Sequence, residues 1–316
     1  MAEETQQPTV TFAQRLVYWA LRMVAFALNC LPLRIALAFA SIIGRIWFLI
    51  DRKHRRRMVV DIARSLSLSE AEAYAIAKRV HAHFGMAAIE FLRFDKMKPE
   101  ELYARVEYDR DQIEMYMKTI KERGAIYITG HIGSWELAGG WTVHQGWMRG
   151  AIARPLKNPL LNQWLRQKRE ALGMEIWDQE GAILRAMKIV KGKEAFAMLA
   201  DQDGGGKGII VPFFGRLAST MSMGCDLAMR CNAPMFVGAV LREGPMRYRL
   251  VIEDMLEPNP EADPKEERIR LATEMNRCLE AFIRKAPEQW IWFHHRWRTV
   301  ERMEAARAKE MAAEEK

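Results

Sequence analysis

The pattern of hydrophobic positions divides the chain into an apolar start, a helical middle and a remainder in which strands and helices alternate. Residues 12–50 are strongly apolar and rich in Trp and Phe. Pro32 divides them into two helical halves, because proline lacks the amide hydrogen that a helix interior needs. Basic residues interrupt both halves: Arg15, Arg22, Arg34 and Arg45. A transmembrane helix needs about 20 mostly apolar residues, so the first half barely qualifies.

Three arrangements of this apolar segment remain open: a helical hairpin lying in the membrane interface, a single membrane span, or a buried helical pair. We favour membrane attachment, because the basic run Arg52-Lys53-His54-Arg55-Arg56-Arg57 follows at once. Segments rich in Lys and Arg tend to stay on the cytoplasmic side, which places this run and everything after it in the cytoplasm. No small-residue cleavage site follows a short apolar region, so a signal peptide is not expected.

From residue 58 the periodicity is first helical and then alternates. Residues 58–122 read as helices, and Ser69 followed by acidic residues marks a helix start. Beyond them we expect strands at 125–130, 151–153, 174–177, 195–200, 209–212, 234–240 and 247–253, and helices at 134–145, 158–172, 181–191, 219–231 and 264–285. This succession predicts an α/β fold with a mainly parallel central sheet flanked by helices. The alternating residues 247–253 are expected to form an antiparallel edge.

These elements divide the chain into three predicted segments, and the charge of the first segment indicates what it binds. Residues 1–57 form membrane-attachment helices with the basic run, residues 58–300 form the α/β domain, and residues 301–316 form a charged helical tail in solvent. The net charge of the chain is +8. The first segment holds nine Lys/Arg against three acidic residues, so six of the eight excess charges lie there. An anionic membrane surface is therefore a better partner than a nucleic acid.

No metal or cofactor is expected. The four cysteines, at positions 30, 225, 231 and 278, show neither metal-ligand spacing nor a disulfide framework, which favours a reducing, cytosolic-facing compartment. The Trp-rich run 287–298 contains His294 and His295, but no carboxylate or thiol is spaced to complete a metal site with them. By composition this run would stack on bases or sit at a membrane interface.

The residues with the clearest chemistry follow the expected strand at 125–130. Gly130 and Gly133 bracket His131 as a tight turn requires, and Ser134 is expected to cap a helix that carries Glu136 in its first turn. We expect this turn to bring the carboxylate back to the imidazole, which would fix the tautomer and make the ring a better base. The alternative is a structural turn histidine. Placement after a strand favours the site, because open α/β sheets bind ligands at strand carboxyl ends.

Further candidates follow other predicted strands. Arg154 leaves the second strand and would open onto the same cleft as His131, where a guanidinium binds phosphate or carboxylate. Arg166 and Arg169 lie on the following helix and are candidates for the same cleft. Asp201 precedes a glycine loop and is a second candidate to orient the ring. Ser219 or Thr220 would cap the helix at 219–231, whose amino end attracts an anion.

Together these stretches resemble the bacterial lipid A biosynthesis acyltransferase family. The resemblance rests on the order of motifs over roughly residues 12–300: G-H-x-G-x-W-E at 130–136, R-P-L-K-N-P at 154–159, D-Q at 201–202, F-F-G-x-x-x-x-T at 213–220 and P-E-Q-W-x-W-x-H-x-R-W at 287–297. The family's catalytic histidine falls on His131 and its paired acid on Glu136. The family's arginine falls on Arg154, and its Asp-Gln pair falls on Asp201 and Gln202. Asn158, within the second motif, joins the substrate-binding candidates.

The resemblance also implies an activity. It implies attachment to the cytoplasmic face of the inner membrane, an acyl-carrier-protein or acyl-CoA donor, and transfer of a fatty acyl chain to a hydroxyl of a lipid A precursor or related glycolipid. The more distant glycerolipid acyltransferases usually have Asp where this chain has Glu136, which favours the lipid A branch. A glycerolipid or aminolipid acyltransferase and a non-enzymatic membrane lipid-binding protein remain alternatives.

Overall fold

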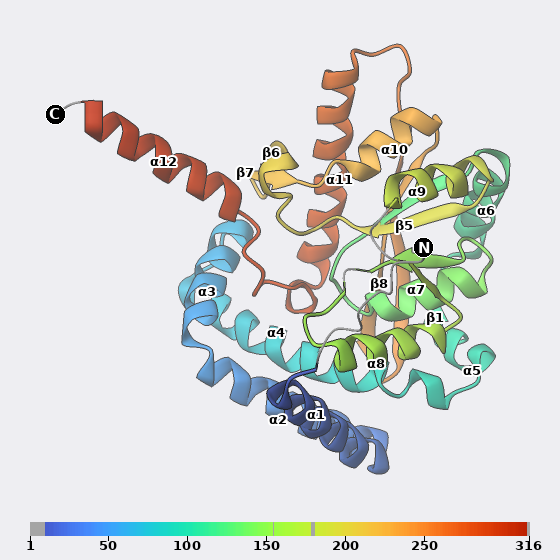
Figure 1. The fold of residues 1–316 in the computed structure, drawn as a ribbon, viewed down its shortest axis with the longest axis vertical. Helices are drawn as coiled ribbons and strands as arrows, with labels where there is room; N and C mark the ends of the chain where they lie inside the picture. The colour runs from blue at the N-terminus through green and yellow to red at the C-terminus, as the bar shows by residue number, and fades with distance from the viewer. Residues whose placement is uncertain (1–9, 154, 178–180, 315–316) are drawn as a thin grey trace, which may run out of the picture.

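The computed structural model describes residues 10–153, 155–177 and 181–314, which fold around a seven-stranded sheet (Figure 1). The strand order is β1-β9-β8-β2-β5-β3-β4. The strands are β1 Val106–Glu107, β2 Ala125–Thr129, β3 Gly150–Ile152, β4 Glu175–Trp177, β5 Ala195–Leu199, β8 Met235–Gly244 and β9 Arg247–Leu256. All neighbours pair in parallel except β8 and β9. The predicted mainly parallel α/β fold is therefore confirmed. β9 is antiparallel as expected, although the two-residue β1 occupies the edge beside it.

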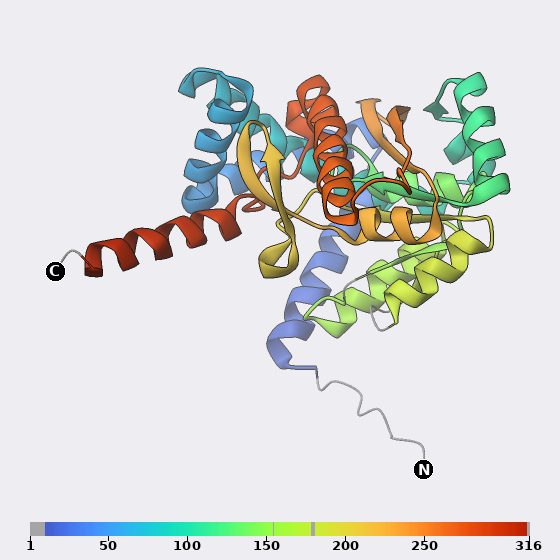
Figure 2. The same cartoon turned by 90° about the horizontal axis from the view of Figure 1, so that it is seen from above.

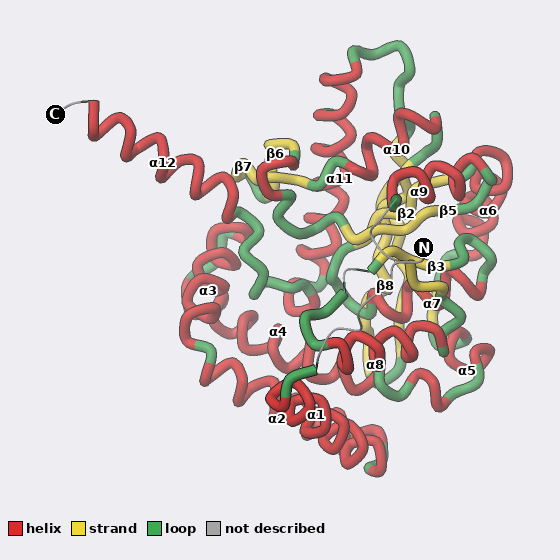
Figure 3. The backbone as a smooth tube through the Cα atoms, viewed as in Figure 1, coloured by secondary structure: helices red, strands yellow, loops and turns green. Residues whose placement is uncertain are grey.

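Helices cover both faces of the sheet (Figure 3). After the four N-terminal helices come α5 Pro99–Tyr103, α6 Arg110–Arg123, α7 Trp135–His144, α8 Pro159–Glu170, α9 Ala182–Lys191, α10 Met223–Cys231, α11 Pro264–Lys285 and α12 Arg298–Glu314. Every residue of β2 is buried. Ile126 and Ile128 belong to a core shared with α9, α10 and α11, whereas Ala125 and Tyr127 belong to a second core shared with α6 and α7. This two-sided burial explains why β2 is a continuous apolar run without polar alternation.

The N-terminal helices are α1 Phe12–Cys30, α2 Leu33–Ile50, α3 Arg52–Leu66 and α4 Glu70–Phe91. Pro32 is the N-cap residue of α2, so the chain breaks where the sequence predicted. Helices α2 and α4 cross closely, because a Cβ at Gly44 would lie 2.1 Å from the His81 carbonyl oxygen and one at Gly85 would lie 2.3 Å from that of Ala40. Small residues at both positions let the two backbones touch.

The outer surface of α1 and α2 is apolar. Large side chains that are about half exposed or more include Phe12, Leu16, Met23 and Phe26 of α1 and Phe39, Ile42, Ile46 and Ile50 of α2. Within the described residues, α2 is the one helix long and apolar enough to cross a membrane, with a mean hydropathy of 1.9 and 28% of its residues buried. The second apolar half, rather than the first, therefore meets this criterion.

Residues 209–220 form a separate antiparallel hairpin, β6 Ile209–Phe213 and β7 Arg216–Thr220. The predicted helix at 219–231 therefore begins later, at Met223 of α10. The turn between the strands is Phe214-Gly215, where both residues have positive φ, 50° and 72°. A two-residue turn with positive φ at both positions matches the twist of the flanking strands. The segments on either side of it therefore pair as a hairpin. Thr220 is consequently a buried strand residue and not a helix cap.

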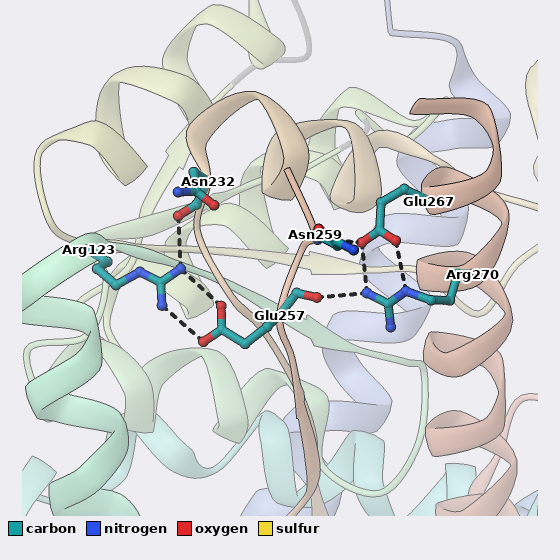
Figure 4. Close-up of polar contacts among 6 residues, drawn as sticks. All are labelled: Arg123, Asn232, Glu257, Asn259, Glu267 and Arg270. Atoms are coloured by element: carbon teal, nitrogen blue, oxygen red, sulfur yellow. Dashed lines mark hydrogen bonds and ion pairs between the residues drawn. The ribbon is translucent and has the colours of Figure 1, made fainter. Parts of the chain in front are cut away.

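Polar contacts fasten the end of the sheet where β2 begins (Figure 4). Arg123, the last residue of α6, donates to the Glu257 carboxylate at 2.9 and 3.0 Å and to the Asn232 carbonyl at 3.1 Å. Arg270 of α11 donates to the Glu257 carbonyl at 2.7 Å and pairs with Glu267. Because Arg123 and Glu257 are more than a third exposed, this pair contributes at most about 1 kcal/mol. The contacts join α6, α10, β9 and α11 at the end opposite to His131.

The charged C-terminal residues form α12, which projects from the body of the molecule in both views (Figures 1 and 2). Its side chains beyond Val300 are exposed. The helix begins at Arg298, three residues before the predicted tail.

Candidate functional site

A glycine turn at the carboxyl end of β2 presents His131. After Thr129 and Gly130, the backbone of Ile132 forms an antiparallel bridge with Trp290, and the Gly133 amide donates to the Gln289 carbonyl at 3.0 Å. Gly133 has φ +62°, and a Cβ there would lie 2.1 Å from the carbonyl oxygen of Val240 in β8. Only glycine fits this turn, because both the dihedral angle and the close backbone exclude a side chain.

Asp201 is the hydrogen-bond partner of the His131 ring. Its Oδ1 lies 2.9 Å from His131 Nδ1, and its Oδ2 accepts the His131 backbone amide at 2.7 Å. Oδ2 also accepts the indole N–H of Trp290 at 2.8 Å. Asp201 follows β5, the parallel neighbour of β2, so both residues leave the same edge of the sheet. The carboxylate is fully buried, while about a quarter of the His131 side chain is exposed.

The surroundings of His131 and Asp201 shift the pKa values of both side chains. Burial of the His131 ring acts to lower its pKa, but the charge and hydrogen bond of Asp201, with a further contribution from the Glu136 charge, outweigh burial and raise the pKa above its ordinary value. Burial conversely acts to raise the pKa of Asp201, and its interactions with His131 and Trp290 hold the pKa below the ordinary value. Asp201 is therefore ionised and accepts a hydrogen bond from Nδ1–H. No described residue is hydrogen-bonded to Nε2, so this nitrogen can act as a base.

Glu136 does not make the contact predicted from its spacing. It lies in the first turn of α7 and accepts two hydrogen bonds from Arg169 of α8, at 2.7 and 2.9 Å. Helix α7 starts at Trp135, whose ring lies 5.6 Å from that of His131, and the next residue, Glu136, contacts Arg169 of α8 instead of the imidazole. Ser134 is the N-cap residue, but its side chain makes no capping hydrogen bond. The ring is thus oriented by Asp201, whereas Glu136 acts on it only through charge.

The other predicted site residues separate into different places. Arg154 lies outside the described residues. Asn158 caps α8 and donates to the Gln14 carbonyl of α1 at 2.9 Å. Arg166 is exposed and contacts Glu170 and the Ile176 carbonyl.

Of the remaining candidates, Arg169 reaches the site through Glu136, and Gln202 is half-buried next to Asp201. Thr220 is fully buried, and its hydroxyl accepts from Arg296 at 2.7 Å and from Asn276 at 3.0 Å. Its predicted anion-binding role assumed a helix start at 219, and this start is wrong because α10 begins at Met223.

The Trp-rich run supports the site from behind. Besides the bond from Trp290 to Asp201, the side-chain amide of Gln289 bonds both the amide and the carbonyl of Arg242 at 2.8 Å, which ties the run to β8. His294 is half-buried beside the pair, and burial lowers its pKa to about 4. The described residues contain no group of three or more His, Cys, Asp or Glu arranged for a metal. Nothing in the sequence of this run signalled these pairings.

A row of aromatic rings leads from His131 to the exposed surface of α2. The ring centre of Phe84 in α4 lies 5.7 Å from that of Trp135, and the ring centre of Phe293 lies 4.9 Å from that of Phe84. Phe293 in turn lies 5.5 Å from Trp47 of α2, which is 42% exposed. An apolar wall therefore connects the site with the apolar surface of the N-terminal helices.

Comparison with known proteins identifies the family of the chain. A model of the bacterial lipid A biosynthesis acyltransferases matches residues 4–299. The chain is 28% identical over 183 residues to the lipid A biosynthesis palmitoleoyltransferase of Escherichia coli K12, covering 57% of this chain and 58% of that protein. It is 29% identical over 154 residues to the lauroyltransferase of the same organism, covering 47% and 48%. The aligned region thus spans about half the length of these curated relatives. Since the family model covers nearly the whole chain, the protein belongs to the bacterial lipid A biosynthesis acyltransferase family.

Proposed function

We propose that this protein transfers a fatty acyl chain from a thioester, on an acyl-carrier protein or coenzyme A, to a hydroxyl of a lipid A precursor or related glycolipid. The observation that carries the proposal is the His131–Asp201 pair, formed at the carboxyl ends of two neighbouring strands in a member of this family. A histidine held by a buried carboxylate, with no described residue bonded to its second nitrogen, is the base that such a transfer needs.

In the proposed reaction, Nε2 of His131 is the general base. Nε2 of His131 takes the proton from the acceptor hydroxyl as its oxygen attacks the thioester carbonyl. The C–O bond forms, a tetrahedral oxyanion develops and collapses, and the C–S bond breaks. The imidazolium returns its proton to the leaving thiolate, so protons balance and no covalent acyl-enzyme is required. Asp201 stabilises the imidazolium through its Nδ1–H bond.

Glu136 and Arg169 have supporting roles in this proposal. The Glu136 charge favours the imidazolium that forms during transfer, since it contributes to the raised pKa of His131. Arg169 fixes this carboxylate with two hydrogen bonds, both groups being mostly buried. Because Glu136 and Arg169 pair with each other, neither of these two charges is unpartnered beside the reacting groups.

The aromatic row and the N-terminal helices support a lipid substrate at the membrane. Trp135, Phe84 and Phe293 offer an apolar wall along which an acyl chain would lie. The exposed surfaces of α1 and α2 would insert into the bilayer interface. The basic run that begins α3 would then face the anionic cytoplasmic leaflet, which supports a location on the inner membrane with the site on the cytoplasmic side.

The test is acyl transfer by the full chain in detergent or lipid vesicles, with an acyl-carrier-protein or coenzyme A thioester as donor and a lipid A precursor as acceptor. Product is followed by lipid mass spectrometry and free thiol by colorimetry. We expect His131→Ala to lower transfer about 10²- to 10⁴-fold. His144→Ala, an exposed histidine at the end of α7, is the matched control and should stay near wild type.

The outcomes separate the candidate functions. Transfer to a glycerolipid or aminolipid, with none to a lipid A precursor, would reassign the acceptor while keeping the site. Absence of thioester turnover in the folded wild-type chain with every acceptor would reject an enzyme and favour a membrane lipid-binding protein. Equal turnover by His131→Ala and His144→Ala would reject the assigned base.

A further inference from the structure

A cavity of about 460 Å³ lies outside the His131 site, between α1, α8 and the 3-10 turn η1 (Phe94–Lys96). Both apolar and charged side chains line it. The apolar lining is Ala25, Phe26 and Trp164, and the basic lining is Arg22, Lys96 and Lys168. Asp95 is the single acidic residue of the lining. Three cations against one carboxylate give the cavity an excess of positive charge.

Arg22 makes cation–π contacts with two aromatic rings at the wall of the cavity. Its guanidinium carbon lies 5.2 Å from the centre of the Trp164 ring and 5.8 Å from that of Tyr18. Within the described part of the chain, no carboxylate contacts this guanidinium. Contact with aromatic rings does not use the N–H donors in hydrogen bonds to an acid, so they are available for an anion.

The two lysines differ in how much charge they offer. Lys168 pairs with Asp95 at 2.6 Å and donates to the Leu92 carbonyl at 3.1 Å, so its ammonium is largely neutralised. Lys96 makes one long contact, 3.4 Å to the Asn29 carbonyl, and is exposed. The excess charge of the cavity therefore lies on Arg22 and Lys96, on opposite sides of the opening between α1 and η1.

Contacts on both ends of α1 hold this cavity in shape. At the carboxyl end, Arg93 donates to the carbonyls of Leu28 and Leu31 and to the Asn29 side chain. At the amino end, Gln14 and Asn158 exchange hydrogen bonds with the backbone of the neighbouring segment. The cavity is thus a built feature of the helix packing and not a gap beside a loose helix.

The occupant follows from what surrounds the opening. Phe26, which lines the cavity, is 72% exposed, and Met23 on the same helix is 70% exposed. A ligand bound here would have an anionic group against Arg22 and Lys96 and apolar chains along α1. We propose that this cavity binds the phosphate headgroup of a membrane lipid. The inference rests on the membrane attachment in the proposed function, but it does not depend on the transfer reaction.

A carrier protein is a less suitable occupant. Specific protein interfaces bury about 800 Å² on each partner, whereas the positive charge here is confined to a cavity of about 460 Å³ beside an apolar helix surface. A phosphate group fits that volume, and its oxygens match the donor edge of an arginine.

The binding test uses the full chain in detergent micelles and three probes. Dioctanoyl phosphatidic acid carries both features, dioctanoylglycerol carries the chains alone, and inorganic phosphate carries the anion alone. Affinity is measured by calorimetric titration, and acetylation of lysines by acetic anhydride is located by mass spectrometry. We expect phosphatidic acid to bind most tightly and to slow acetylation of Lys96 and Lys168, while exposed Lys98 continues to react.

Matched variants test the two cations. Arg22→Gln combined with Lys96→Gln should weaken phosphatidic acid binding about tenfold or more, because both charged donors are lost. Arg15→Gln combined with Lys98→Gln removes the same charge from exposed positions nearby, Arg15 on α1 and Lys98 two residues beyond η1, and should change binding less than about twofold. Equal weakening in both double variants would show general charge attraction and overturn the assigned site.

The other possible outcomes of the binding test identify a different occupant. Equal affinity for dioctanoylglycerol would show apolar binding only, and equal affinity for inorganic phosphate would show a free-anion site. Protection of the lysines by acyl-carrier protein but not by phosphatidic acid would assign the surface to the carrier. His131→Ala should bind phosphatidic acid like wild type. Absence of transfer by the wild-type chain with retained phosphatidic acid binding would therefore count against the proposed function alone, and transfer by the wild-type chain without that binding would count against this inference alone.

Discussion

Asp201→Asn gives the sharpest test of the site, because the geometry dictates how the amide must orient. Oδ2 of Asp201 faces two donors, the His131 amide at 2.7 Å and the Trp290 indole at 2.8 Å. In the variant, the amide oxygen must take this position, since an NH₂ group there would face two N–H groups. The NH₂ is then directed at Nδ1 of His131, which must become an acceptor. The proton moves to Nε2, and the base is lost.

The magnitude follows from this tautomer change. In serine proteases, the same replacement behind the catalytic histidine costs about 10⁴-fold. The Glu136 charge remains near the ring in this variant, so we expect a loss of about 10³- to 10⁴-fold in kcat/KM, or about 4–5.5 kcal/mol of transition-state stabilisation. The shape of the side chain is unchanged, and thermal unfolding should show a folded variant. The assay is thiol release from an acyl thioester with a lipid acceptor, across pH.

The pH dependence provides a second readout. His131 has a raised pKa, so its pairing stabilises the fold below its unfolded value of 6.5 and this contribution is lost as pH rises through the folded pKa. Asp201 has a lowered pKa, so its contribution is present above its unfolded value and is lost as pH falls through the folded pKa. Both dependences should weaken in Asp201→Asn. A variant that keeps more than a tenth of wild-type kcat/KM would refute the tautomer argument.

Three further predictions concern the surroundings of the pair. Glu136→Gln should lower kcat/KM about 10- to 100-fold and leave the tautomer intact, so its pH–rate profile should shift to lower pH without losing its shape; a profile like that of Asp201→Asn would contradict this. Gly133→Ala should destabilise the fold by several kcal/mol, measured by denaturant unfolding, because a Cβ would lie 2.1 Å from the Val240 carbonyl at φ +62°; a stability equal to wild type would mean that the turn rearranges freely. Trp290→Phe removes one donor from Asp201 and should cost about 1–3 kcal/mol in unfolding free energy while raising the pKa of that carboxyl; an unchanged acid limb of the stability curve would argue against the bond.

The sequence determined the elements and the position of the reactive histidine. The apolar run at β2 and the glycines around His131 are local features, because a strand buried on both faces needs continuous apolar residues and a positive φ needs glycine. The order of strands and helices likewise follows from hydrophobic periodicity, which reports burial element by element. The prediction of a helix from residue 219 is wrong at its start. A two-residue turn at Phe214-Gly215 reverses the chain, so residues 216–220 form the second strand of a hairpin.

The tertiary structure alone decided which groups meet. Glu136 is five residues from His131, yet Arg169 holds it, whereas Asp201, 70 residues away, holds the ring. That partner is set by strand order, because β2 and β5 lie side by side in register and end at the same edge. The Trp290 contact, 89 residues from Asp201 in sequence, depends in the same way on a bridge between distant loops. Spacing along a chain limits which contacts are possible, but the sheet's register selects among them, and no local pattern encodes that register.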